Sequence, residues 1–170
     1  MRKQTSMRWK QWFSFPDLKR CKACKDKTGT IYPIEEAVFP NKLHLHCRCY
    51  IKLLDSIKVG TCTYEGINGA DYTLIHDGIL PSYYISKKEA INLGWKPGES
   101  LSNYCPGKMI AGGVYNNRNR HLPEATGRVW FEADINYYIG KRNSSRILYS
   151  NDGLVFVTFD HYSTFSEIIQ

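Results

Sequence analysis

The stretch WFEADINYYIGKRNSSRILYS, residues 130–150, carries the pattern that decides the fold. Successive side chains of a β-strand point to opposite faces, so residues 130–137 divide into an apolar set and an opposite, mostly polar set. The apolar set is Phe131, Ala133, Ile135 and Tyr137, and the opposite set is Trp130, Glu132, Asp134 and Asn136. Asn143-Ser144 is a turn signal before a second strand, RILYS. The stretch therefore predicts paired strands with one packed face and one face open to a ligand.

Strand signals continue on both sides of this stretch. MIAGGVY precedes it, and LVFVTF and TFSEII follow it. Helical signals come earlier: in SKKEAINLG, Ser86 is a good N-cap, Glu89 completes a capping box and Gly94 suits the C-terminus. A weaker helix is expected over 67–76. Helices followed by strands at hairpin spacing predict an α+β fold, with N-terminal helices packed on a twisted antiparallel sheet.

The composition bounds the class of protein. The chain has 170 residues, of which 42% are hydrophobic and 14% aromatic, so it is not wholly disordered. The sequence has no run of about 18 apolar residues, so no transmembrane helix is expected. The N-terminus is basic but lacks an apolar core, which makes it a poor secretory signal. The composition changes near residue 60, and 55–72 is expected to be a linker between two parts, residues 1–60 and 61–170.

The net charge of +7 is unevenly distributed. Residues 1–60 contain 13 Lys/Arg and 5 Asp/Glu, a net charge of +8, whereas residues 61–170 contain 10 and 11, a net charge of −1. Such a basic segment suits nucleic acid, or an anionic membrane or partner surface. The run 8–27, with Trp9, Trp12 and Phe13, could grip RNA, and a solvated, partly amphipathic leader is the alternative.

The second part holds candidates for acid–base chemistry. Glu132 could act as a general base, and His161 in DHYSTF could act as the acid. Positive charge for an anionic transition state could come from Lys87, Arg142 and Arg146. This set fits phosphodiester cleavage without a metal. The alternatives are a solvated strand glutamate and structural arginines, one of them paired with Asp134.

Several segments together resemble one family. YISKKEAINLGW, PGKMIAGGVYNNRNRHLP, GRVWFEADINYYIGKRNSSRILYSNDGLVF and DHYSTF resemble barnase and its relatives, the small microbial extracellular ribonucleases. The resemblance covers roughly residues 67–170, with one short gap after Gly113. It implies the microbial ribonuclease fold and an endonuclease acting on RNA, because DNA lacks the attacking 2′-hydroxyl.

The resemblance also implies a role for each candidate. Glu132 would take the proton of the 2′-hydroxyl, and His161 would protonate the departing 5′-oxygen, leaving a 2′,3′-cyclic phosphate. Lys87, Arg142 and Arg146 would hold the phosphate. Asp134 would brace Arg142, and Tyr162 would lie beside the nucleotide.

The loop that binds guanine in this family departs from its pattern here. Tyr115, Asn117 and Arg118 fit the pattern, but Asn119 stands where the family has a glutamate. An amide offers one neutral carbonyl acceptor in place of a carboxylate. We therefore expect these residues to bind the base with a weaker guanine preference. The loop is one residue shorter, and Gly153 replaces a bulky residue, a change expected to affect packing alone.

The first part is rich in cysteine. Cys21 and Cys24 form one close pair and Cys47 and Cys49 another, with His44 and His46 beside them. Such pairs suit a structural tetrahedral zinc, although disulfides or free thiols would give the same sequence, and the spacing does not decide which residues complete the site. Residues 9–54 also resemble the C-terminal end of phage Mu F-type minor head proteins, a family often joined to toxin domains.

The leading hypothesis is an endoribonuclease, with no cofactor for catalysis, used as a secreted or delivered toxin. The partners expected from the family resemblance are RNA and a small acidic inhibitor of the barstar type, and the expected location is extracellular. The alternative is a phage-derived structural or RNA-binding module with an inactive nuclease domain.

Overall fold

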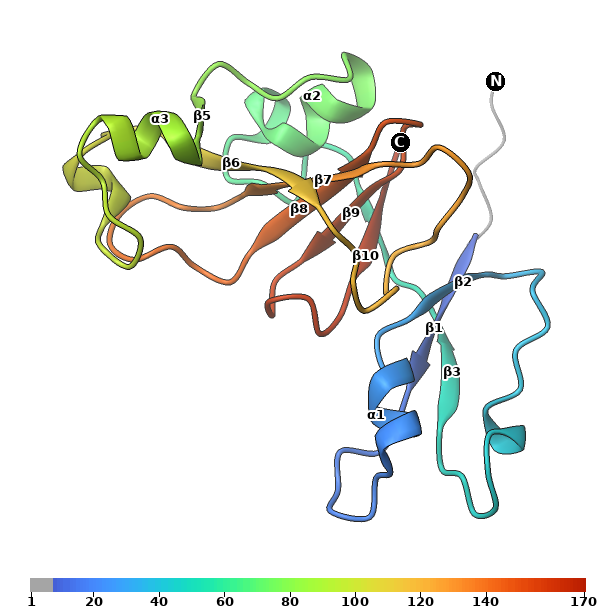
Figure 1. The fold of residues 1–170 in the computed structure, drawn as a ribbon. Helices are drawn as coiled ribbons and strands as arrows, with labels where there is room; N and C mark the ends of the chain where they lie inside the picture. Colours follow the sequence, from blue (N-terminus) through green and yellow to red (C-terminus); the bar gives the residue numbers. More distant parts are fainter. Residues whose placement is uncertain (1–7) are drawn as a thin grey trace. The chain divides into compact units, whose positions relative to one another are not determined.

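A computed structural model describes residues 8–170 (Figure 1). The chain forms two compact units. The first comprises residues up to Ser56 together with Asn117–Thr126, and the second comprises Ile57–Asn116 and Gly127–Gln170. Arg2 and Lys3 of the predicted basic leader lie outside the described residues. Over residues 8–170, no helix has the length and apolar character needed to cross a bilayer.

The first unit contains a small antiparallel sheet. Its strands are β1 (Trp9–Phe13), β2 (Ile31–Pro33) and β3 (Tyr50–Leu53), with β1 in the centre. Two short helices complete it, α1 (Lys22–Lys27) and η1 (Pro40–Lys42). The buried apolar residues of this unit include Trp12, Cys24, Ile31 and Leu54. This is a small core for a unit of its size, a point that bears on the cysteine cluster described below.

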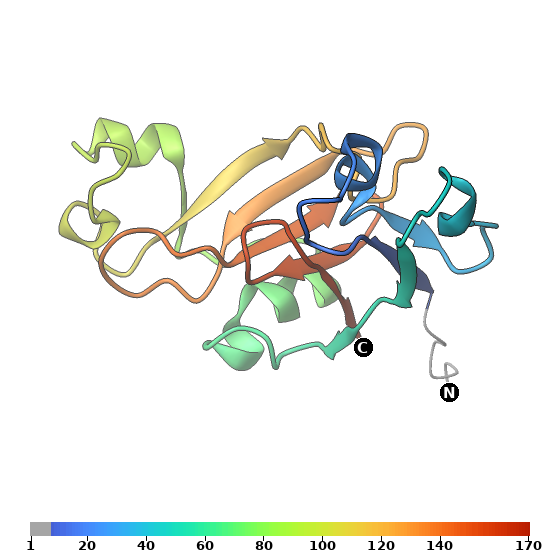
Figure 2. The same cartoon turned by 90° about the horizontal axis from the view of Figure 1, so that it is seen from below.

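The second unit is built on a seven-stranded sheet with the order β4-β10-β9-β8-β7-β6-β5 (Figures 1 and 2). The strands from β10 to β6 pair antiparallel, whereas β5 and β6 pair parallel. The strands are β4 (Ser56–Lys58), β5 (Tyr84–Ser86), β6 (Met109–Tyr115), β7 (Trp130–Asp134), β8 (Arg146–Ser150), β9 (Val155–Thr158) and β10 (Ser166–Ile169). The predicted α+β class is thus confirmed.

Helix α2 (Ala70–His76) packs on one face of this sheet (Figure 2). Ala70 and Leu74 meet the side chains that β7, β8 and β9 turn toward the helix. These include Ile147 on β8 and Ala133 on β7, which is on the apolar face that the sequence predicts. The catalytic candidates on the same strands are thereby turned to the opposite face.

A second core lies around α3 (Lys87–Asn92) and η3 (Leu101–Asn103). Trp95 and Leu101 are buried there against β6. The predicted capping box of Ser86 and Glu89 is formed, and Gly94 has a φ of +98°. These features fix the start of α3 directly after β5, which places Lys87 at the end of that strand.

Three details differ from the sequence prediction. The single helix expected over 67–76 is a 3-10 turn, η2 (Gly66–Asn68), followed by α2, because the chain is extended at Gly69. Strand β7 ends at Asp134, since Asn136 adopts a φ of +56°. The segment expected to be a linker is ordered: it contains β4, and Val59 donates a hydrogen bond to the carbonyl of Ile169.

Asp71 holds the loop that precedes α2. Its fully buried carboxylate accepts hydrogen bonds from Gly60 N at 2.8 Å, Cys62 N at 3.2 Å and Thr63 Oγ1 at 2.7 Å. A buried carboxylate is stable only when such donors replace water. The loop after β4 is therefore tied to the helix that covers the sheet.

The Asp71→Ala variant should lower the free energy of unfolding by about 2–3 kcal/mol, because it leaves buried donors unpaired. Chemical denaturation monitored by fluorescence would measure the change. Asp77→Ala, at the exposed C-terminal end of the same helix, is the control and should be nearly neutral. Equal stability of the two variants would contradict the role given to Asp71.

Candidate active site

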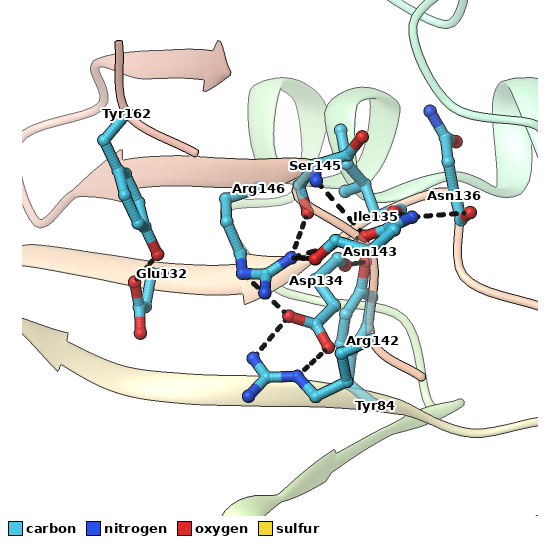
Figure 3. Close-up of polar contacts among 10 residues, drawn as sticks. All are labelled: Tyr84, Glu132, Asp134, Ile135, Asn136, Arg142, Asn143, Ser145, Arg146 and Tyr162. Atoms are coloured by element: carbon cyan, nitrogen blue, oxygen red, sulfur yellow. Dashed lines mark hydrogen bonds and ion pairs between the residues drawn. The ribbon is translucent and has the colours of Figure 1, made fainter. Parts of the chain in front are cut away.

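Glu132 lies in the middle of β7, on the face opposite α2. Its carboxylate is half-buried and accepts a hydrogen bond at Oε2 from the hydroxyl of Tyr162, at 2.6 Å (Figure 3). Among residues 8–170, no hydrogen bond engages Oε1. One carboxylate oxygen is therefore held, and the other is available to a ligand.

Gly112 makes the room that Glu132 occupies. The neighbouring strand β6 has a bulge between Ala111 and Gly113, so Gly112 faces Glu132 closely. A Cβ at Gly112 would lie 2.5 Å from Cγ of Glu132 and 2.7 Å from Oε1. Real Cβ contacts are essentially never this short. The sequence prediction missed this residue, although a Gly-Gly pair inside a strand is a known signal for a bulge.

Asp134 is fully buried and binds two arginines (Figure 3). Arg142 donates from Nε and Nη2 to the two carboxylate oxygens, both at 2.6 Å. Nε of Arg146 lies 3.0 Å from Oδ1. The prediction that Asp134 stands on an open face is therefore wrong, because two guanidiniums cover it.

The two arginines differ in exposure. Arg146 is buried, and its Nη1 also donates to the carbonyls of Asn143 and Ser145. Arg142 keeps 24% of its side chain exposed, and its hydrogen bonds with Asp134 raise the pKa of its guanidinium. Arg142 thus presents a permanent positive charge at the surface of the site, with Arg146 behind it. Asn143, which the sequence analysis named only as a turn residue, lies between the two arginines in the chain and donates to the carbonyls of Ile135 and Asn136.

His161 lies in a tight loop after β9. His161 and Tyr162 both have positive φ, +56° and +71°. Asp160 holds this loop by accepting hydrogen bonds from Thr158 Oγ1, Ser163 N and both donors of Thr164. Partial burial raises the pKa of the Asp160 carboxyl, but these hydrogen bonds outweigh it and lower the pKa overall. The loop exposes the imidazole of His161 beside Tyr162, with ring centroids 4.8 Å apart.

Two stacked tyrosines, Tyr115 and Tyr162, lie next to Glu132. The rings of Tyr115, at the end of β6, and Tyr162 are stacked with centroids 5.3 Å apart. Burial raises the pKa of both phenols, and the carboxylate of Glu132 raises both further. Both hydroxyls therefore stay protonated at neutral pH, and that of Tyr162 is a hydrogen-bond donor to Glu132.

Lys87 is brought to the same region by strand order. Ser86 on β5 pairs with Ala111 on β6, which in turn pairs with Ala133 on β7, between Glu132 and Asp134. Lys87 follows Ser86 directly and is exposed. Within residues 8–170, its ammonium group makes no hydrogen bond or ion pair. Lys87 is therefore an exposed cation at the end of β5, two strands away from Glu132 in the sheet.

The remaining loop candidates belong to the first unit. Arg118 and Asn119 are exposed there. The side chain of Asn117 is buried and is bonded to Leu122, since its Nδ2 donates to the carbonyl and its Oδ1 accepts from the backbone N–H. The sequence analysis expected the Asn117 amide to bind the base of the substrate, but in the structure this amide stabilises the loop itself.

The cysteines of the first part also lie in the first unit. Cys21, Cys24 and His44 have their ligand atoms within 4.8 Å of one another, and so do Cys24, Cys47 and Cys49. Cys24 belongs to both groups. All six cysteines of the chain are free thiols in the structure.

Comparisons with known proteins define the family. A family model described as ribonuclease matches residues 67–169. The chain is 49% identical over 107 residues to a ribonuclease of Heyndrickxia coagulans, a match that covers 62% of this chain and 95% of that protein. Ribonucleases of Bacillus intermedius and Bacillus pumilus show the same identity over 107 residues, which is 64% of each. The chain therefore belongs to the ribonuclease family, as an endoribonuclease of the barnase type.

The Gly112→Ala variant should reduce ribonuclease activity by about 10²-fold, because the added methyl group would displace the carboxylate of Glu132, and a misplacement of about 1 Å in an active site has an effect of this size. Its backbone has an ordinary φ, so the fold should be retained. Gly153→Ala is the counterpart, with a φ of +91° and open space around it. That variant should lose about 1 kcal/mol of stability from backbone strain and keep its activity. An active Gly112→Ala enzyme would contradict this account of Glu132.

Proposed function

We propose that the second unit cleaves RNA by transphosphorylation through a 2′,3′-cyclic phosphate, with Glu132 as general base and His161 as general acid. The observation that carries the proposal is that the half-buried carboxylate of Glu132 lies on the same strand as Asp134, whose buried carboxylate holds Arg142 and Arg146. A base next to fixed positive charge suits the conversion of a hydroxyl into a nucleophile that attacks a phosphate.

In the first half of the step, Oε1 of Glu132 accepts the proton of the ribose 2′-hydroxyl. The 2′-oxygen then forms a bond to phosphorus. Tyr162 supports this arrangement because its hydrogen bond to Oε2 fixes the orientation of the carboxylate. The stacked rings of Tyr115 and Tyr162 offer an aromatic surface for a base or ribose.

In the second half, the bond between phosphorus and the 5′-oxygen breaks, and His161 gives its proton to the departing oxygen. Arg142 and Lys87 are the exposed cations for the phosphate oxygens, whose negative charge shifts as the bonds change. Arg146 adds positive charge from within and, with Asp134, holds Arg142 in place. No cofactor takes part in this step, so a metal in the cysteine cluster would have a structural role.

Substitution of either proton-transfer group should reduce cleavage of RNA by about 10²–10⁴-fold, the usual effect of losing a general acid or base. The variants are Glu132→Gln and His161→Ala. Their controls are Glu124→Gln and His76→Ala, both at exposed positions. Initial rates on a fluorogenic RNA oligonucleotide, measured in EDTA, would provide the test. Full activity of either site variant, or no activity of the wild type in EDTA, would refute the mechanism.

We further propose that base recognition is relaxed because Asn119 replaces a carboxylate. Arg118 and Asn119 are exposed and available to a base, while Asn117 is committed to the loop. A carboxylate at 119 would accept charge-assisted hydrogen bonds, which are about twice as strong as neutral ones.

The Asn119→Glu variant should raise the preference for guanine over adenine at the 5′ side of the cleaved bond by about tenfold, which corresponds to one charge-assisted hydrogen bond. Ratios of kcat/KM on dinucleotides that differ in the 5′ base would measure it, with Asn116→Glu as the control. A wild type that already prefers guanine as strongly as the variant would exclude relaxed recognition.

We also propose that the enzyme acts as a secreted or delivered toxin, with RNA of a target cell as substrate. The support is the family resemblance together with that of residues 9–54 to a phage family often joined to toxin domains. A producing cell then needs a small acidic inhibitor that covers Lys87 and Arg142, with charge complementarity that speeds association. Co-expression with a candidate acidic protein would test this: the complex should be inactive, and unimpaired cleavage would exclude that candidate.

A further inference from the structure

The cysteine cluster of the first unit brings two groups of metal-ligand atoms together at Cys24, one with Cys21 and His44 and the other with Cys47 and Cys49. Sγ of Cys24 lies 3.8 Å from Sγ of Cys47 and 2.9 Å from Nε2 of His44, which is 3.3 Å from Sγ of Cys21. Two sulfurs bound to one zinc at about 2.3 Å are about 3.8 Å apart at the tetrahedral angle, and a sulfur and a nitrogen are about 3.5 Å apart. The Cys24–Cys47 separation matches the first value and the Cys21–His44 separation is near the second, whereas Cys24 and His44 lie closer together than a shared metal requires.

His44 is oriented as a metal ligand. Its Nδ1 lies 2.8 Å from the carbonyl oxygen of Leu45. A carbonyl only accepts hydrogen bonds, so Nδ1 carries the proton and Nε2 has a free lone pair. That lone pair faces the sulfurs of Cys21 and Cys24. Histidines that bind metals are held in this way, with the second ring nitrogen bonded to a carbonyl or carboxylate.

A backbone donor and two cations lie next to the cluster. The backbone N–H of Cys24 donates to Sγ of Cys21 at 3.4 Å. Lys19 and Arg20 line the hollow over the cluster, where positive charge suits a site with excess thiolate.

We propose that the first unit binds one structural zinc ion through Cys21, Cys24, Cys47 and His44. Cys49 lies next to the site, within 4.8 Å of Cys24 and Cys47. The sequence offered the four cysteines as a possible set and left the completing residues open; this set has His44 in place of Cys49. Units of this size rarely fold on their core alone, so the metal would join α1 to the segment before β3.

Metal analysis of the purified full-length protein should find one zinc per chain. Competition with a chromogenic chelator should show that His44→Ala weakens zinc binding at least tenfold, a loss of the size seen when ligand positions are disturbed. The matched control, His46→Ala, should bind like the wild type. Cys24→Ser should lose the metal, whereas Cys62→Ser, a buried cysteine of the second unit, should keep it.

Ribonuclease activity of the same samples reports separately on the folding of the second unit. Unchanged zinc affinity in His44→Ala would overturn the ligand assignment. A wild type purified under reducing conditions with no metal and six reactive thiols would overturn the site. The site would also be overturned if, before any reductant is added, the intact mass of the wild type were lower than that of the reduced chain by the hydrogens lost in forming two disulfides.

A second observation concerns the loop 117–126, which belongs to the first unit. The backbone N–H of Ile31, at the start of β2, donates to the carbonyl of His121 at 2.7 Å. Gly29 lies under the ring of His121, and a Cβ there would be 3.0 Å from two ring atoms. Gln11 holds Gly29 in turn, through a 2.8 Å hydrogen bond from Nε2 to its carbonyl.

We infer that the first unit is a specificity element, because it sets the conformation of the loop that carries Arg118 and Asn119. The inference rests on the proposed ribonuclease function and on base recognition by this loop. The contacts of Ile31 and Gly29 with His121 attach the middle of the loop to the start of β2. Within the loop, the side chain of Asn117 is hydrogen-bonded to the backbone of Leu122. A disturbance at β2 is thereby transmitted to the base-binding residues.

The test is Gly29→Ala, which presses a methyl group against His121. Its control is Gly98→Ala, which has nearly the same φ, +97° against +94°, and open space around it. Gly29→Ala should change the ratios of kcat/KM among dinucleotides by about threefold or more, as expected for a shift of a few tenths of an ångström. Gly98→Ala should leave the ratios unchanged.

Unchanged ratios in Gly29→Ala, with the wild type active, would overturn the inference and leave the proposed function standing. An inactive wild type would instead overturn the proposed function. A thermal melt of each variant distinguishes a shifted loop from an unfolded first unit: altered ratios support the inference when Gly29→Ala is folded at the assay temperature, and altered ratios with an unfolded unit count against it.

Discussion

The site depends on one buried carboxylate, that of Asp134, held between the guanidiniums of Arg142 and Arg146. A carboxylate removed from water is stable only when opposite charges and hydrogen bonds compensate it. Strand β7, strand β8 and the loop between them must therefore keep both arginines in place. The hydrogen bonds and ion pairs that stabilise Asp134 in the core also hold the guanidiniums of the site in place before any substrate binds.

Preorganisation extends from Asp134 to the rest of the site. Glu132 precedes Asp134 by two residues, so both side chains lie on the same face of β7, and Gly112 leaves the space that the carboxylate needs. The loop carrying His161 and Tyr162 is fixed by Asp160, and Tyr162 reaches back to Glu132. Groups aimed in advance at developing charge account for much of the power of enzymes.

The sequence alone was sufficient for the local features. Alternation predicted that Ala133 and Ile135 lie on the packed face, and both belong to the core that includes α2, although Trp130 on the other face is also buried. The capping box of Ser86 and Glu89 predicted the start of α3. It was not sufficient where distant segments meet. The double pairing of Asp134, the space at Gly112 and the attachment of His121 to β2 depend on strand register and on contacts between residues far apart in the chain. Likewise, the orientation of His44 is set by a carbonyl that no spacing rule identifies.

The central claim is that a 2′-hydroxyl deprotonated by Glu132 is the nucleophile. A dinucleoside phosphate and its 2′-deoxy counterpart, differing in this one oxygen, test it most directly when their products are separated by chromatography in the absence of divalent metal. The ribose substrate should give a 2′,3′-cyclic phosphate and a free 5′-hydroxyl, and the deoxy substrate should remain intact. Cleavage of the deoxy substrate, or a linear phosphate as the first product, would contradict the account.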